Sequence, residues 1–206
     1  MKKVRVKITL LEELLGMCAK ADVHEKFIAS KAPDAQSREE EIEALGVEQV
    51  TDNTRTIFPR HDGKPFMWDY QMKGFFKDSC GMLRRAAGTK SSKLTAHKKI
   101  IDGMIFPGPR RIMLQLPDDA AIGNCQRPLR AETAQGPRIA LADSETVPEG
   151  TVLEFHVSIL EPTAKKGMPT LEECLIEWLH YGQYRGLGQW RNSGKGIFDF
   201  EIIEKE

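Results

Sequence analysis

The chain has 206 residues, 40% of them hydrophobic, and its 30 Lys or Arg balance 30 Asp or Glu, so its formal net charge is zero. This is the length and composition of one globular domain with a buried core, and it excludes a disordered or collagen-like chain. No apolar run reaches the length of a membrane span, and charges interrupt the first residues, so we expect neither a membrane partner nor a signal peptide. The four cysteines, Cys18, Cys80, Cys125 and Cys174, are scattered, which indicates reduced thiols and a cytoplasmic location. No spacing of His and Cys predicts a metal ion, and we expect no cofactor.

The first half of the chain opens with one clear strand and continues into one clear helix. Apolar and polar residues alternate over Val4–Leu10, which predicts a half-buried strand. Residues 16–62 show little periodicity beyond a short helix at Arg38–Leu45. After the turn at Asp62–Pro65, apolar residues at helical spacing predict a helix over Tyr70–Ala87. Lys90–Lys99 is basic and is predicted to be a loop.

The second half is richer in predicted strands. A capping box, Thr170 with Glu173 three residues later, marks the start of a helix over Leu171–Tyr181. Pro117–Glu132, which contains Arg127 and Arg130, is predicted to be an extended loop. The predicted strands are Ile100–Phe106, Arg111–Leu116, Pro137–Ala142, Thr151–Leu160 and Ile197–Ile203.

Strand, helix, strands, strand, helix and strand is the order of a ferredoxin-like (RRM-like) β-α-β-β-α-β sandwich of the α+β class. We therefore predict one domain over residues 1–206, with insertions at about 16–62 and 88–135.

The segment Tyr181–Gly196 is the most informative one, because five glycines and three cations lie in it without an acid. Glycines let a backbone approach a ligand and present bare N–H groups to it. Arg185, Arg191 and Lys195 supply positive charge, and Tyr184 and Trp190 offer stacking surfaces. This chemistry suits phosphates and unpaired bases. A nucleotide P-loop is excluded, because the spacing differs and a strand follows instead of a helix. A tight connection between helix and strand is the simpler alternative.

Charge is unevenly distributed along the chain. Seven acids but only Arg38 lie between Asp34 and Asp52, whereas ten Lys or Arg face two acids between Gln71 and Arg111. Separate blocks of opposite sign suit an anion-binding face, or copies stacked head to tail, and they can also be ordinary solvated faces.

Three stretches follow one another along the chain: Pro65–Asp78 around Lys73-Gly74, the turn and strand Glu145–Phe155 with Arg127–Arg130 upstream, and the glycine-rich end with its Phe-containing strand. Together and in this order they resemble the RAMP superfamily of RNA-binding CRISPR proteins, and most closely its guide-RNA-coating backbone subunits. Relatives have Pro-Gly-Ser-Ser before the Lys-Gly pair, whereas this chain has Trp68-Asp69-Tyr70-Gln71.

The resemblance implies a role and a set of contact residues. The partners would be single-stranded guide RNA and either copies of this chain or other effector-complex subunits, in a protein that takes part in antiviral defense. The expected RNA-binding residues are Lys73, Lys77, Arg84, Arg85, Tyr184, Arg185, Gly186, Gly188, Trp190, Arg191, Gly194, Lys195 and Gly196.

The resemblance leaves two alternatives open. One is a metal-independent endoribonuclease, for which Asp22, His24 and Asp34 are the catalytic candidates and His61 lies near the helix turn. The other is a protein-interaction module, such as a virus-borne mimic that inhibits a CRISPR effector complex, which the acidic Glu39–Glu43 favours because it would repel RNA.

Overall fold

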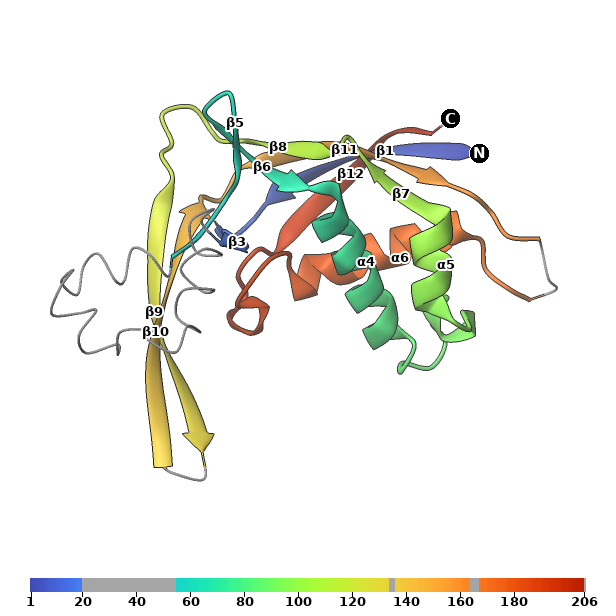
Figure 1. Cartoon of the computed structure of the whole chain (residues 1–206). Helices are drawn as coiled ribbons and strands as arrows, with labels where there is room; N and C mark the ends of the chain where they lie inside the picture. Colours follow the sequence, from blue (N-terminus) through green and yellow to red (C-terminus); the bar gives the residue numbers. More distant parts are fainter. Residues whose placement is uncertain (20–54, 134–135, 164–166, 206) are drawn as a thin grey trace, which may run out of the picture.

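The computed structural model describes residues 1–19, 55–133, 136–163 and 167–205 and is shown in Figure 1. One large antiparallel sheet carries the helices on one of its faces, and its strand order is β12-β1-β11-β8-β6-β5, with β7 also paired to β11. The strands of this sheet are β1 (Lys2–Leu10), β5 (Arg60–His61), β6 (Lys64–Trp68), β7 (Ile105–Gly108), β8 (Arg111–Gln115), β11 (Val152–Ile159) and β12 (Phe198–Lys205).

The strand order of the sheet confirms the predicted α+β, ferredoxin-like fold. β1 leads through helix α4 (Asp69–Leu83) to a second strand that is divided into β7 and β8. β11, helix α6 (Leu171–Arg185) and β12 follow. In the sheet the first strand lies between the last and the third, and all of these pairs are antiparallel.

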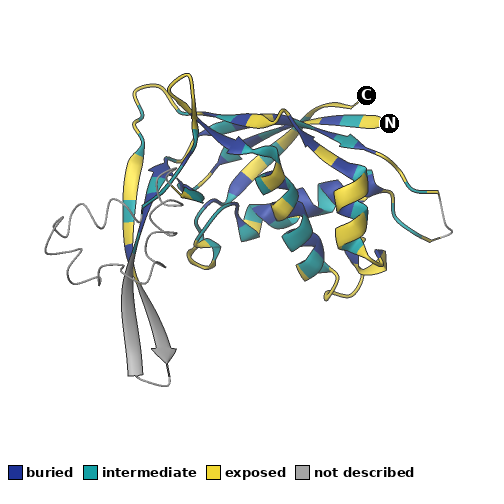
Figure 2. Cartoon of the chain, in the orientation of Figure 1, coloured by how far each residue is buried: buried dark blue, intermediate teal, exposed yellow. Residues whose placement is uncertain are grey.

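Alternation along β1 determines which face of the sheet is buried. Val4, Val6, Ile8 and Leu10 are at most 1% exposed, while Arg5 on the other face is exposed. The pattern predicted from sequence is therefore confirmed. The buried side chains face the helix layer, where burial of each such side chain contributes about 1.5–3 kcal/mol. Figure 2 shows the resulting layers, with the buried positions between sheet and helices.

The helices are joined through aromatic side chains of the core. Phe76 of α4 packs on Trp178 of α6 with ring centroids 5.7 Å apart, and Phe75 of α4 packs on Phe198 of β12 at 5.8 Å. Trp178 is fully buried, and its indole N–H donates to Ser91 Oγ at 2.9 Å. The buried polar atom of this large side chain is thus satisfied within the core.

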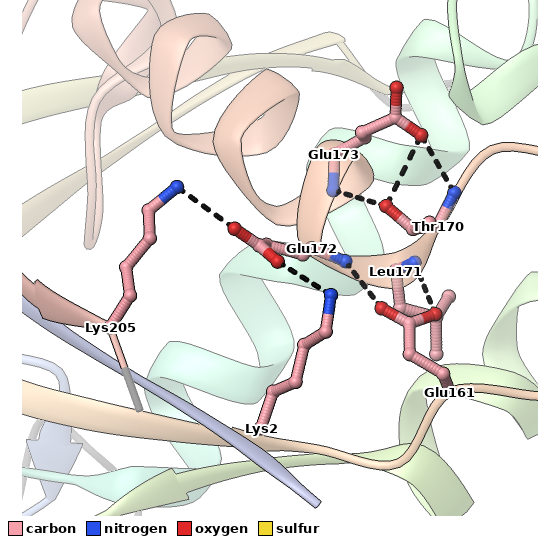
Figure 3. Close-up of polar contacts among 7 residues, drawn as sticks. All are labelled: Lys2, Glu161, Thr170, Leu171, Glu172, Glu173 and Lys205. Carbon is pink, nitrogen blue, oxygen red and sulfur yellow. Dashed lines mark hydrogen bonds and ion pairs between the residues drawn. The ribbon is translucent and has the colours of Figure 1, made fainter.

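Both terminal strands are tied to the start of α6, as Figure 3 shows. Glu172 accepts hydrogen bonds from Lys2 of β1 at 2.9 Å and from Lys205 of β12 at 2.8 Å. These two lysines lower the pKa of the Glu172 carboxyl. The predicted capping box is present, since Glu173 N donates to Thr170 Oγ1 at 3.1 Å and Thr170 N donates to Glu173 at 2.8 Å.

A second sheet is built around a long hairpin that projects beside the sandwich (Figure 1). β9 and β10 pair antiparallel from Gly123↔Thr146 to Thr133↔Gly136, and short strands add to β10 near the sandwich. Its strands are β2 (Leu14–Leu15), β3 (Cys18–Ala19), β4 (Thr56–Ile57), β9 (Gly123–Thr133) and β10 (Gly136–Val147).

Three predicted elements were wrong. Ile100–Phe106 is not a strand: helix α5 (His97–Met104) occupies most of it, and it packs on α4. The predicted loop at Lys90–Lys99 contains a short 3-10 helix, η1 (Ser91–Lys93), and the start of α5. Pro117–Glu132 is not a loop beyond residue 122, because the β10 ladder holds β9 in an extended strand.

Two further observations concern the described ranges as a whole. No helix among them is long and apolar enough to cross a membrane. Nor do they contain a group of three or more His, Cys, Asp or Glu side chains placed to hold a metal ion.

Candidate nucleic-acid interface

The glycine-rich loop, residues Gly186–Gly196, is a tightly folded connection between α6 and β12. Helix α6 extends to Arg185, beyond its predicted end at Tyr181, so Tyr184 and Arg185 are helical. Leu187 N donates to Gly196 O at 2.8 Å, and Gly196 N donates to Glu13 O at 2.9 Å. The loop is thus closed on itself and fixed to the segment that follows β1.

The glycines of this loop serve mainly its own packing. A Cβ on Gly186 would lie 2.5 Å from Lys195 O, and one on Gly188 would lie 2.7 Å from Leu14 Cδ1. The N–H groups of Gly186 and Gly194 donate to backbone carbonyls of the chain at 2.8 and 3.1 Å. The expectation that these glycines offer bare N–H groups to a ligand is therefore wrong for Gly186, Gly194 and Gly196.

Acids from other parts of the chain neutralise the cations of the loop. Lys195 lies 3.2 Å from Glu12 and 3.0 Å from Glu13, and its hydrogen bond to Glu13 raises its pKa. Arg191 pairs with Asp78 of α4 at 2.7 Å. Arg185 lies 3.7 Å from the same carboxylate and donates to Asn192 at 2.9 Å.

The two predicted stacking residues have different surroundings. Tyr184 is 84% exposed on the last turn of α6. Trp190 is 40% exposed and has a left-handed backbone with φ of 53°. The Arg127 guanidinium lies 5.2 Å from the Trp190 ring centroid and donates to Gln189 at 3.1 Å. Arg127 is 6% exposed, so Trp190 rests on a buried cation with part of its ring open to solvent.

Of the four predicted cations, Lys73 and Lys77 lie on α4, and Arg84 and Arg85 follow its last residue, Leu83. Lys73 donates to the Asp102 carbonyl at 3.2 Å, and Lys77 forms an ion pair with the Asp102 carboxylate. Arg84 lies 2.9 Å from His97 Nδ1. Burial, followed by the Arg84 charge, lowers the pKa of His97, so this imidazole is neutral at pH 7. Arg85, on the next position, is exposed.

Lys77, Arg84 and Arg85 border an open hollow of about 550 Å³, which we call the basic groove. Four of its lining residues are Lys or Arg, and Asp78 is its one acid. Asp78 also lines a neighbouring hollow of about 200 Å³ between α4 and the glycine-rich loop, where Arg191 adds a further cation. The basic groove is lined by Lys77, Asp78, Gly81, Met82, Arg84, Arg85, His97 and Lys98.

The structure therefore brings together part of the predicted site. Lys77, Arg84 and Arg85 line the basic groove, and Arg191 and Gly188 line the hollow beside it. Lys73 lies farther along α4, while Tyr184 borders neither hollow. Lys98 and His97 also line the groove; they were not among the predicted contact residues, and their segment was predicted to be a loop rather than the start of α5.

The catalytic candidates Asp22, His24 and Asp34 lie outside the described residues. His61, on β5, lies 3.1 Å from Arg111 and does not line the basic groove.

Comparisons with known proteins assign no role to any residue of this chain. No known protein family matches the sequence, and no curated protein matches it. Among solved structures, the chain is similar to one from the cryo-EM structure of the Type III-B Cmr-beta bound to cognate target RNA, with 13% identity and a TM-score of 0.49. The similarity covers 100% of this chain and 60% of that chain, so this chain spans less than two thirds of its neighbour.

Proposed function

We propose that this chain binds single-stranded RNA through the basic groove, gripping the RNA backbone with little regard to base identity. The observation that carries the proposal is the charge of the groove, where four Lys or Arg side chains face one acid in a chain of zero net charge. Exposed Arg84 and Arg85 provide forked donors for phosphate oxygens. An open hollow on a helix surface suits a flexible strand better than a small molecule, which binds in a more enclosed cavity.

The glycine-rich loop contributes shape to this interface more than charge. Asp78 of α4 pairs with Arg191 of the loop and with Arg185 at the end of α6, so Asp78 holds both segments against α4. Trp190, supported by Arg127, offers a partly open ring on which a base can stack. We propose that the RNA contacts Trp190 and the groove cations, and that Gly186, Gly188 and Gly196 keep the loop in place.

We further propose that the chain acts as one domain and as a backbone-type subunit of a CRISPR-like ribonucleoprotein, whose copies stack head to tail along guide RNA. The ferredoxin-like strand order and the three ordered motifs at Pro65–Asp78, Glu145–Phe155 and Gly186–Gly196 support this proposal.

The test measures the binding of a labelled, unstructured RNA by fluorescence anisotropy over a series of salt concentrations. Each phosphate contact contributes about −0.7 to the slope of log affinity against log salt for a single strand. The double variant Arg84→Gln/Arg85→Gln is expected to weaken binding roughly tenfold and to reduce the magnitude of this slope by about 1 to 1.5. Unchanged affinity and slope would refute the assignment of the groove.

A control with the same change in net charge separates local contacts from the overall field. Lys7→Gln/Lys64→Gln serves this purpose, because Lys7 lies on the sheet face away from the helices and Lys64 is exposed at the start of β6. This control is expected to retain the affinity and the slope. Light scattering on the purified protein tests stacking: RNA-containing assemblies that dissociate as salt rises support it. An RNA-free monomer contradicts it and favours the protein-interaction module.

A further inference from the structure

A second recess lies at the opposite end of α4 from Arg84 and Arg85. It forms where β6 leads into α4 and where β7 leads toward β8, and it has a volume of about 150 Å³. This is the volume of about five waters, enough for a single planar ring system. We call it the Tyr70 pocket, and it is lined by Asp69, Tyr70, Lys73, Phe106, Pro107 and Arg110.

Aromatic and cationic side chains alternate around this pocket. Tyr70 is 52% exposed and Phe106 is 40% exposed, which is unusual for two aromatic rings at one recess. The Arg110 guanidinium lies 5.4 Å from the Tyr70 ring centroid, and Lys73 Nζ lies 4.9 Å from that of Phe106. Each ring at the pocket thus has a cation beside it.

Neighbouring residues hold the Tyr70 side of the pocket in place. Trp68 stacks with Tyr70 at an interplanar angle of 15° and a centroid distance of 6.2 Å. Arg110 also lies 5.2 Å from the Trp68 ring and pairs with Asp69 at 2.6 Å. Two nearly parallel rings and a guanidinium therefore hold one another in place beside the pocket, and unpaired bases stack on aromatic rings and guanidinium planes of this kind.

Asp69 adds a directional acceptor to this surface. Among the described contacts, Tyr70 N at 2.7 Å and Arg110 at 2.6 Å both donate to Asp69 Oδ1. The second carboxylate oxygen, Oδ2, accepts none of these bonds and can receive one from a ligand. A carboxylate accepts from the exocyclic amino group of cytosine, whereas uracil presents a carbonyl oxygen at the same position and is repelled.

We propose that the Tyr70 pocket binds one unpaired nucleobase of an RNA strand and prefers cytosine to uracil. The base stacks on Tyr70, its amino group donates to Asp69, and Lys73 and Arg110 contact the adjoining phosphate. An apolar peptide side chain would contact the rings but make no ionic contact with the cations. A bare anion would contact the cations but would not stack on the rings. Lys73 is one helical turn from Lys77 of the basic groove, so a strand that follows α4 reaches both sites. The inference rests on the proposed function for the identity of the ligand.

The first experiment uses CMP, UMP and ribose 5-phosphate as probes and follows the tryptophan fluorescence of the intact chain. CMP is expected to quench Trp68 with an affinity about three- to tenfold higher than that of UMP, and ribose 5-phosphate is expected to bind more weakly than either. Trp68→Phe is expected to remove the signal. Equal binding of all three probes would mean that only phosphate is recognised and would overturn the proposal.

Three variants assign the contacts. Tyr70→Leu removes the stacking ring at a half-exposed position and is expected to weaken CMP binding about tenfold, whereas Tyr70→Phe keeps the ring and is expected to bind like the parent. Asp69→Asn can donate as well as accept, so the preference for CMP over UMP is expected to disappear. A preference that survives Asp69→Asn, or an affinity that survives Tyr70→Leu, would overturn the assignment. Unchanged melting temperatures confirm that the variants fold.

The failures of the two proposals are distinguishable. If the chain binds CMP selectively and binds no RNA strand, the proposed function fails and the pocket stands. If RNA binds through Arg84 and Arg85 while CMP binds no better than ribose 5-phosphate, the pocket fails alone. Where both hold, Tyr70→Leu lowers the affinity for a cytosine-rich RNA about tenfold with an unchanged salt slope, because stacking releases no counterions.

Discussion

Replacing Gly196 by alanine tests whether the glycines of the loop serve packing, as the structure indicates, or ligand binding. A Cβ on Gly196 would lie 2.3 Å from Leu187 O and 3.1 Å from Leu14 Cδ1. Gly194, in the same loop, is a matched control, because a Cβ there meets nothing within 4 Å. Both residues have positive φ, +71° and +82°, so alanine is strained at both positions.

The expected free energies of unfolding follow from these two contributions. A left-handed backbone costs alanine about 1–2 kcal/mol at either position. The lower entropy of the unfolded chain offsets part of this cost equally in both variants. Contact with the Leu187 carbonyl adds about 1–3 kcal/mol for Gly196→Ala alone. The difference between the variants is therefore about 1–3 kcal/mol, which corresponds to roughly 2–12 °C in melting temperature for a chain of this size.

Urea denaturation followed by circular dichroism measures this difference. Gly196→Ala is expected to have the lower midpoint at an unchanged dependence on denaturant, which shows that stability changed and not the unfolded state. Equal midpoints for Gly194→Ala and Gly196→Ala would refute the packing role. The glycines would then be available for a ligand, as the sequence had indicated.

Three further predictions concern the core and the start of α6. Hydrogen bonds from Lys90 and the helix cap lower the pKa of Glu173 to about 2, so its contribution to stability is present above pH 4.5 and is lost as pH falls toward 2. The difference in urea midpoint between the parent and Glu173→Gln should therefore close over that range, and a constant difference would contradict this cause. Burial raises the pKa of Cys174 to about 12, so iodoacetamide at pH 8 should label this thiol only after unfolding. Mass spectrometry measures the labelling rate. If Cys174 were labelled as fast in the native protein as in the denatured protein, this expectation would be wrong. Trp178→Phe replaces a buried indole by a smaller ring and leaves Ser91 Oγ without the indole donor. The free energy of unfolding, measured by urea titration, should therefore fall by about 1–3 kcal/mol. An unchanged free energy of unfolding would mean that neighbouring side chains repack around the smaller ring.

Local signals predicted the elements whose structure is decided locally. The capping box at Thr170 and Glu173 is present, and the alternation over Val4–Leu10 gives a strand with one buried face. In each case a short stretch of sequence contains both the pattern and its cause. The strand and helix order then sufficed for the fold, because few topologies accommodate it.

Elements decided by distant partners were not predictable in this way. Ile100, Ile101 and Met104 fit one face of a helix as well as a buried strand, and the contact of α5 with α4 decides between them. The polar β9 is extended because it pairs with β10 along its whole length, from Gly123 to Thr133. The cause of its conformation therefore lies in β10 and not in the residues of β9. Strand propensity depends strongly on such context.

The same distinction explains the candidate site. Arg185, Arg191 and Lys195 lie close together in the sequence, but their acidic partners come from other elements. Glu12 and Glu13 lie more than 180 residues before Lys195, and no local pattern connects them. Arg84 and Arg85, which were predicted to bind RNA, form no ion pair among the described residues and line the basic groove.

Acids on and beside α4 therefore determine which of the neighbouring cations are already paired and which can contact an anion. Asp78 on one side of it pairs with Arg185 of α6 and Arg191 of the loop, and Asp102 of α5 pairs with Lys77 on the other side. These ion pairs connect α4 to the loop and to α5 and so restrain the distances between these segments. The same restraints determine the width of the groove. Arg84 and Arg85 pair with neither acid and leave a positive surface beyond the end of α4. Under the proposed function a polyanion is attracted to this surface, and the paired cations beside it hold the groove in shape.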